Sequence, residues 1–187
     1  MKADAIKRII QRAQPKEFPD KTAYNSISIS HTDQLSKAMG VSRRQIEIMA
    51  LEHGVVPERY ARNMKTFSPQ DQIALLNARV SIIGLGGLGG AVVEILARIG
   101  VGTLNVIDGD TFEESNLNRQ FLSLPARMSK PKAEAAAQRI KTLNSAVDIN
   151  AHHLFLDAEN GAALLRHSDV CVDCLDNLKT RFTLERL

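Results

Sequence analysis

The feature that most constrains the fold is a short apolar run that leads directly into a cluster of glycines. Residues 80–83 are rich in β-branched side chains and predict a buried strand. Gly84, Gly86 and Gly89 follow in a G-x-G-x-x-G pattern, and the apolar side chains of residues 91–99 recur at helical spacing. Glycines let a phosphate approach the backbone, and the first N–H groups of a helix attract anions. The stretch therefore predicts a nucleotide-binding turn between a strand and a helix.

A second strand supports this interpretation. Residues 103–107 form an apolar run that ends at Asp108, roughly 20 residues beyond the glycine pattern. Dinucleotide-binding folds place an acidic side chain at this position, where it accepts hydrogen bonds from ribose hydroxyls.

The rest of the chain continues the alternation of strands and helices. We expect a helix over residues 132–143, a strand over 147–155, a helix over 158–166 and a strand over 169–174. Aromatic residues make up only 4% of the chain, so the core must consist mainly of Ile, Leu, Val and Ala. We predict an α/β fold, a Rossmann-like, mostly parallel sheet with helices on both faces.

The region before residue 57 has a different pattern and predicts a small helical extension. A helix is expected over residues 4–14, followed by an arm or linker to residue 30. Residues 32–53 then resemble a helix-turn-helix, with a capping box between Ser42 and Gln45. This pair is interpreted either as packing against the main domain, which we favour, or as a DNA reader. The predicted domains are residues 1–56 and 57–187.

Charge and hydropathy exclude several classes of protein. The net charge of +3 is a small excess and has little weight as evidence for a polyanionic partner. No apolar run reaches the roughly 18 residues that a membrane-spanning helix needs, and the charged N-terminus lacks the apolar core of a signal peptide. We expect a cytoplasmic protein without a membrane partner.

The two cysteines, Cys171 and Cys174, have C-x-x-C spacing but do not predict a zinc site. Residues three apart on a strand point to opposite faces, so the two sulfurs would not converge on one ion. A single C-x-x-C also supplies only half of a four-ligand zinc site. We predict two buried free thiols and expect no zinc in this chain.

Polar side chains gather where the predicted strands end. The segment from residue 109 to 120 is too rich in Asn, Arg and Gln for a simple connection. Lys132 lies in the first turn of a helix, where a cation is unfavourable unless an anion binds beside it. Asp176 follows the last strand and suits magnesium, which prefers carboxylate and phosphate oxygens. Two cations and an acid beside a phosphate turn favour chemistry on a triphosphate. The candidate site comprises Gly84, Gly86, Gly89, Asp108, Asn116, Arg119, Gln120, Lys132 and Asp176.

Each of these residues also has a purely structural interpretation. Asp108 would then cap a turn, Lys132 would be a solvated helix residue, and Arg119 would pair with a neighbouring glutamate.

Five motifs, in order, resemble the ThiF/MoeB/HesA family, the bacterial relatives of ubiquitin-activating enzymes. The resemblance covers residues 57–187. Its motifs are residues 59–62, the glycine turn at 84–89 with residues 108–110, the run 115–120, residues 130–132 and residues 173–177.

The resemblance implies that ATP is the nucleotide and that the chain is an adenylyltransferase. Its substrate would be the C-terminal glycine carboxylate of a ubiquitin-like sulfur-carrier protein, and pyrophosphate would be released. Asp108 would bind the ribose, and Asp176 would bind Mg²⁺. An arginine that matches Arg62 reaches into the nucleotide site of the partner subunit in family dimers, so a homodimer is implied. The phosphate contacts would come from Asn116, Arg119, Gln120 and Lys132.

Three other functions stay open. Family members usually continue past the stretch that ends at Leu187, with further strands and often zinc-binding cysteine pairs, so a non-catalytic nucleotide-binding or dimerisation scaffold is one alternative. The glycine turn is also compatible with an NAD-dependent oxidoreductase. The third alternative is a DNA-binding regulator that uses residues 32–53, although we favour a protein that does not bind nucleic acid.

Overall fold

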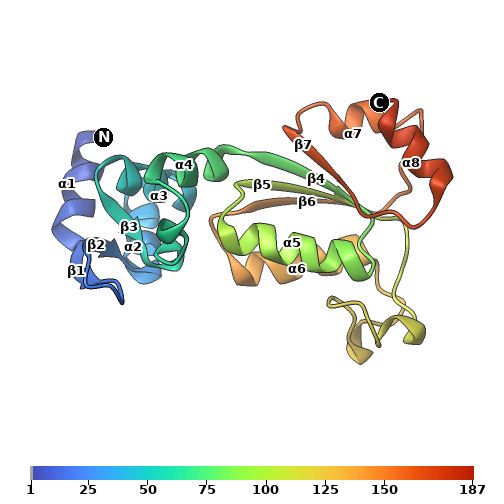
Figure 1. The fold of residues 1–187 in the computed structure, drawn as a ribbon, viewed down its shortest axis with the longest axis horizontal. Helices are drawn as coiled ribbons and strands as arrows, with labels where there is room; N and C mark the ends of the chain where they lie inside the picture. The colour runs from blue at the N-terminus through green and yellow to red at the C-terminus, as the bar shows by residue number, and fades with distance from the viewer. Residues whose placement is uncertain (1) are drawn as a thin grey trace. The chain divides into compact units, whose positions relative to one another are not determined.

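The computed structural model describes residues 2–187 (Figure 1). The chain forms two compact units, which meet in sequence between Asn77 and Ala78. The predicted domain boundary after residue 56 lies earlier than this division, and it stays a prediction about the extent of the nucleotide-binding domain. Among residues 2–187, no helix combines the length and the apolar character that a membrane span requires.

The first unit combines helices with a small sheet. The sheet has the order β1-β2-β3, with β1 antiparallel and β3 parallel to β2. Residues 14–27, which the sequence analysis interprets as an arm or linker, thus contain two paired strands. The elements are α1 (Lys2–Arg12), β1 (Gln14–Glu17), β2 (Ala23–Ile27), α2 (Ile29–Met39), α3 (Arg43–Glu52), β3 (Val55–Pro57), η1 (Glu58–Tyr60), η2 (Asn63–Lys65) and α4 (Pro69–Asn77).

Helix α3 lies at the centre of the first unit. Its N-terminus has the predicted capping box of Ser42 and Gln45, and half of its ten residues are buried. Only Gln45 and Glu52 are exposed along this helix, and Arg43 is paired with Asp33 of α2. A recognition helix must present its side chains to a DNA groove. The burial of α3 within the first unit is unlike that of a recognition helix, and the packing of the pair against the main domain stays a prediction.

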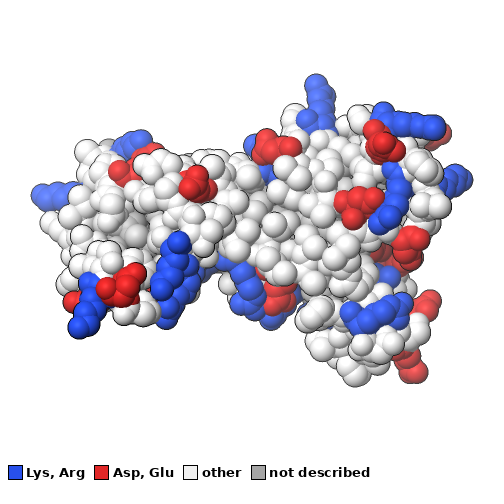
Figure 2. Space-filling model, in the orientation of Figure 1, with Lys and Arg blue, Asp and Glu red and all other residues white. Residues whose placement is uncertain are grey.

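The surface charges agree with this conclusion. On the face shown in Figure 2, Lys and Arg alternate with Asp and Glu over each unit, and no continuous basic stripe is visible. A clustered basic surface is the electrostatic footprint of most nucleic-acid-binding proteins.

One acidic side chain is buried in the core of the first unit. Glu47 of α3 is 2% exposed, and its Oε1 lies 3.6 Å from Nε of Arg59. Its Oε2 has no hydrogen-bond partner among the described residues. Desolvation raises the pKa of Glu47 from 4.5 to about 7, despite the opposing effects of Arg59 and of a hydrogen bond from Tyr60. The carboxyl group therefore changes its charge near neutral pH.

We expect this group to make the free energy of unfolding depend on pH. The pKa of Glu47 in the folded state is above its ordinary value of 4.5. The stabilisation that the protonated carboxyl group provides is therefore complete below pH 4.5 and is lost as the pH rises through about 7. The difference between these two pKa values corresponds to about 3 kcal/mol in the free energy of unfolding. Urea unfolding at a series of pH values should show this loss in the wild type and a much flatter profile for Glu47→Gln. Glu52→Gln, on the exposed side of the same helix, is the control, and parallel profiles for Glu47→Gln and the wild type would contradict the assignment.

The second unit has the predicted α/β architecture. Its four strands are all parallel, in the order β6-β5-β4-β7, so β4 and β5 lie at the centre. The elements are β4 (Arg79–Ile83), α5 (Gly87–Ile99), β5 (Thr103–Ile107), η3 (Glu114–Asn116), η4 (Pro125–Arg127), α6 (Lys132–Leu143), β6 (Asp148–His152), α7 (Gly161–Leu165), β7 (Val170–Asp173) and α8 (Leu178–Glu185).

Helices cover both faces of this sheet. Figure 1 shows α5 and α6 on one face and α7 and α8 on the other. On the α7 and α8 side, Ile83 and Ile107 pack with leucines that include Leu164, Leu165 and Leu184. The carboxyl ends of β4 and β5, which carry the glycine turn and Asp108, are thereby fixed in a packed core.

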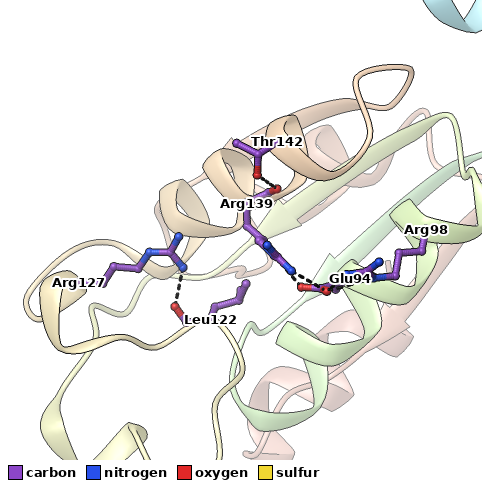
Figure 3. A network of polar contacts seen from close by, with 6 residues as sticks. All are labelled: Glu94, Arg98, Leu122, Arg127, Arg139 and Thr142. Atoms are coloured by element: carbon purple, nitrogen blue, oxygen red, sulfur yellow. Dashed lines mark hydrogen bonds and ion pairs between the residues drawn. The ribbon is translucent and has the colours of Figure 1, made fainter. Parts of the chain in front are cut away.

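Helices α5 and α6 are joined by an ion-pair network (Figure 3). Glu94 of α5 accepts hydrogen bonds from Arg139 of α6, at 2.9 Å from both Nε and Nη2, and from Arg98. The hydrogen bonds from Arg139, with those from Arg98, lower the pKa of Glu94 to about 2. The network aligns the two helices whose N-termini border the candidate site.

The prediction of two buried thiols is wrong. Cys171 is exposed and Cys174 is half-buried, and both are free. The reason is the position of β7 at the edge of the sheet, where only β4 pairs with it among the described residues. Strand periodicity predicts how side chains alternate, but it does not reveal which strand lies at an edge.

Candidate nucleotide site

A cavity of about 340 Å³ lies at the carboxyl ends of the strands of the second unit. Open parallel sheets bind ligands at this end. One part of its lining is polar, and the other is apolar and includes Leu154, Phe155 and Leu175. The predicted site residues that line it are Gly84, Gly86, Asp108, Arg119, Gln120, Lys132 and Asp176. The lining therefore combines charged and apolar side chains, as a nucleotide requires.

A second cavity, of about 310 Å³, lies in the first unit and has a different character. Its lining is mostly apolar, with Met39 and Met49, and its one ion pair joins Lys2 to Glu52 at 3.7 Å. It contains none of the predicted site residues. We therefore place the candidate site in the second unit.

The glycine turn adopts a backbone conformation that other residues disfavour. Gly84 has a φ of 91°, and a Cβ atom there would lie 2.7 Å from the carbonyl oxygen of Cys174. Gly89 does not line the cavity but packs behind it, where a Cβ atom would lie 1.8 Å from the carbonyl oxygen of Gly84. These two glycines allow strand, turn and helix to approach one another closely.

The N-terminus of α5 is left open toward a ligand. Gly86 is the N-cap residue of this helix, and no side chain caps the first N–H groups. A Cβ atom at Gly86 would meet only Nε2 of Gln120, at 3.8 Å. The free N–H groups and the helix dipole together favour an anion at this position.

Asp108 holds the glycine turn. Its Oδ2 accepts a hydrogen bond of 2.6 Å from the N–H of Leu85, and its Oδ1 accepts one of 2.7 Å from the N–H of Asp110. Burial raises the pKa of this carboxyl group, against the effect of those two hydrogen bonds. Asp108 thus caps the turn, and its contact with ribose stays a prediction.

Lys132 is buried, which excludes the interpretation as a solvated helix residue. It is the first residue of α6 and is 6% exposed. Its Nζ lies 3.1 Å from Oδ2 of Asp110, and its backbone N–H donates to the carbonyl oxygen of Asp110 at 3.0 Å. The ammonium group thus lies beside the cavity with a carboxylate as its partner.

Arg119 and Gln120 reach the cavity from the segment between β5 and α6. An isolated bridge between Thr111 and Pro131 closes this segment at its base. Arg119 bonds to the carbonyl oxygen of Ser115 at 2.8 Å and to the side chain of Asn118 at 3.0 Å, so it is not paired with a neighbouring glutamate.

Gln120 lines the cavity and has a buried polar atom without a partner among the described residues. The residue is 7% exposed, and this atom is its Oε1. Buried amide groups are nearly always hydrogen-bonded in folded proteins. A polar group that contacts this side chain would satisfy an otherwise unpaired amide oxygen.

The predicted residues Asn116, Arg62 and Asp176 differ in where they lie relative to the cavity. Asn116 lies behind the cavity lining, where its Oδ1 accepts a hydrogen bond from the N–H of Glu113 at 3.0 Å. Arg62 is exposed and belongs to the first unit. Asp176 is exposed within the lining and precedes Asn177, the N-cap residue of α8.

The sequence analysis missed the apolar part of the cavity lining. Phe155 is 68% exposed, and its ring lies so close to Gly109 that a Cβ atom there would be 2.7 Å away. An exposed aromatic ring in a cavity wall suits stacking against a nucleobase. The position of Phe155, just after β6, was the available signal, because ligands bind beyond the carboxyl ends of strands.

Comparisons with known proteins agree with the fold and identify the family. The chain matches the model of the ThiF family over residues 60–187 and belongs to this family. Over 126 residues it is 40% identical to the adenylyltransferase and sulfurtransferase MOCS3 of Danio rerio, and the match covers 66% of this chain and 28% of the relative. It is also 40% identical over 129 residues to the SAMP-activating enzyme E1 of Haloferax volcanii, and this match covers 68% of this chain and 48% of the relative.

A solved structure extends the comparison to a nucleotide complex. The E. coli tRNA N6-threonylcarbamoyladenosine dehydratase TcdA, in complex with ATP, has a TM-score of 0.66 and 26% identity, and the match covers 68% of this chain and 53% of TcdA. The chain thus spans only part of each of these relatives.

Proposed function

We propose that this chain binds ATP in the cavity of the second unit and adenylylates the C-terminal glycine carboxylate of a ubiquitin-like sulfur-carrier protein, similar to ThiS or MoaD. The observation that supports this most directly is the open N-terminus of α5 at the same cavity as Lys132, Arg119 and Asp176. Relatives named as adenylyltransferases support the class of reaction.

The reaction needs no nucleophile from the protein. A carboxylate oxygen of the carrier attacks the α-phosphorus of ATP and forms an acyl–phosphate bond. The bond between the α-phosphorus and the bridging oxygen breaks, and its electron pair leaves with pyrophosphate. In this proposal, the N–H groups of α5 bind the phosphate chain, and Lys132 and Arg119 neutralise the charge that develops on the leaving group. Phe155 stacks on the base, and Asp108 receives the ribose.

Magnesium fits this site as a ligand that arrives with the nucleotide. No group of three or more potential metal ligands lies together among residues 2–187. Mg²⁺ is typically held by one or two carboxylates together with substrate phosphates. Asp176, exposed in the cavity lining, would supply such a carboxylate. Bound Mg²⁺ would supply further positive charge to the phosphates.

We further propose that the chain works as a cytoplasmic homodimer in which Arg62 enters the partner subunit's cavity. Arg62 is exposed on the first unit. Leu88 at the cavity and Phe121 beside Gln120 are 59% and 76% exposed, as expected for side chains that a second copy covers.

Calorimetric titration of the purified chain with Mg²⁺ and ATP, and separately with NAD, tests the nucleotide assignment. We expect binding of ATP with a dissociation constant in about the micromolar range, and at least about tenfold weaker binding of NAD. Light scattering on the same sample should give the mass of a dimer. Tighter binding of NAD would favour the oxidoreductase, and binding of neither nucleotide would favour the non-catalytic scaffold.

A further inference from the structure

The pair formed by Asp110 and Lys132 suggests a function for a residue that has no role in the proposed reaction. We propose that Asp110 is a resident counter-ion, which holds the Lys132 ammonium group while the cavity is empty and is displaced when a phosphate chain binds. Because it returns when the leaving group departs, Asp110 competes with pyrophosphate for the same cation. The inference rests on the proposed function, since it concerns the phosphate end of the same cavity.

The burial of the two side chains is unequal. The Lys132 side chain is 8% exposed, whereas that of Asp110 is 56% exposed. A buried ammonium group is unfavourable without an anion, all the more at the positive end of a helix such as α6. Asp110, in contrast, can turn into solvent without burying a charge. The partner of Lys132 is therefore exchangeable, while Lys132 itself is held in place.

The backbone around Asp110 supports such an exchange because it stays fixed when the side chain moves. The Asp110 N–H donates to Asp108, and its carbonyl oxygen accepts the hydrogen bond from the N–H of Lys132. The neighbouring bridge between Thr111 and Pro131 closes the same segment. Only the Asp110 side chain has to leave when a phosphate approaches Lys132.

The charges in the cavity lining indicate that the exchange lowers the affinity for pyrophosphate. Asp108, Asp110 and Asp176 line the cavity together with only two cations, Arg119 and Lys132. A phosphate chain that binds Lys132 must replace its existing ion pair, so part of the attraction is offset. Asp110 thus weakens the binding of pyrophosphate and assists its release.

Titration of the full chain with pyrophosphate in the presence of Mg²⁺ tests the proposal directly. Because Asp110 is more than half exposed, solvent screens the pair, and Asp110→Asn should tighten pyrophosphate binding about threefold to fivefold. Asp110→Glu retains a carboxylate and should bind as the wild type does. Glu114→Gln, which removes a charge from the same segment outside the cavity lining, is the matched control and should also have no effect.

A double-mutant cycle with Lys132→Gln distinguishes exchange of partners from simple repulsion. If Asp110 acts through Lys132, Asp110→Asn should change pyrophosphate affinity less than about twofold in the Lys132→Gln background. An undiminished effect in that background, or unchanged or weaker binding by Asp110→Asn alone, would overturn the proposal. Asp110→Ser provides a second removal of the carboxylate if the Asn variant does not fold. Failure of the wild type to bind either ATP or pyrophosphate would instead count against the proposed function.

Discussion

Replacement of Gly89 by alanine is expected to abolish ATP binding, with a loss of affinity of about a hundredfold or more. A Cβ atom at this position would lie 1.8 Å from the carbonyl oxygen of Gly84 and 3.2 Å from the Cβ of Cys174. Gly84 cannot withdraw easily, because its N–H donates to Ile107 at 2.9 Å and its own Cβ position is blocked by Cys174. The helix must therefore move away from the strand, which displaces the N–H groups that we propose bind phosphate.

Calorimetry with ATP measures the loss of affinity in this variant, and thermal unfolding measures the change in its stability. We expect a loss of about 1–3 kcal/mol in stability as well, which is typical of overpacked sites. Gly86→Ala is the matched control for folding, because a Cβ there meets only Nε2 of Gln120, at 3.8 Å. A Gly89→Ala variant that binds ATP within about threefold of the wild type would show that the turn accommodates the methyl group.

Removal of either charged side chain at the phosphate end should abolish exchange of pyrophosphate into ATP. Arg119→Ala and Asp176→Ala are each expected to lower the carrier-dependent rate by about 10²–10³-fold, since each removes a charge that stabilises the transition state or its metal ion. The measurement is incorporation of labelled pyrophosphate into ATP with a ubiquitin-like carrier. Arg166→Ala removes an exposed arginine outside the cavity lining and should leave the rate unchanged. Wild-type rates in both site variants would disprove the site assignment.

The same assay tests whether Arg62 acts in the partner subunit. Mixtures of Arg62→Ala and Arg119→Ala subunits contain hybrid dimers, in which one of the two sites has both arginines intact. After subunit exchange, we expect about a quarter of the wild-type rate from two variants that are each inactive alone. Absence of any recovery, with subunit exchange verified, would place Arg62 outside the partner's site.

Local signals were sufficient for most elements of the second unit. The helix over Lys132–Leu143 has the predicted bounds, and the strands at 79–83 and 103–107 match the apolar runs. The helix buries a regular stripe and the two strands are short, mostly buried runs, so each segment carries a strong local signal. In contrast, β1 is fully exposed and contains Pro15, so its sequence resembles a linker. It is a strand because β2 pairs with it, and that pairing is not encoded within β1 itself.

Some features of the candidate site were likewise visible in the sequence, and others were not. Glycine spacing and the positions of Asp108, Lys132 and Asp176 at element ends were visible in the sequence, at places where ligands of open α/β sheets bind. The partner of Lys132 was not visible, since Asp110 lies 22 residues earlier in the chain. Phe155 was missed because its position just after a strand, the available signal, does not by itself show whether the ring lies in a core or in a cavity wall.

The sequence by itself determined the class of fold, the glycine turn and the family, because each depends on residues close together in the chain or on motifs in a fixed order. Only the tertiary structure decided which strand is at the edge, which carboxylate neutralises Lys132, and which polar atoms are left without partners. These properties depend on burial and on contacts between distant segments. They follow from the packing of the complete sheet and its helices, which no single stretch of sequence specifies.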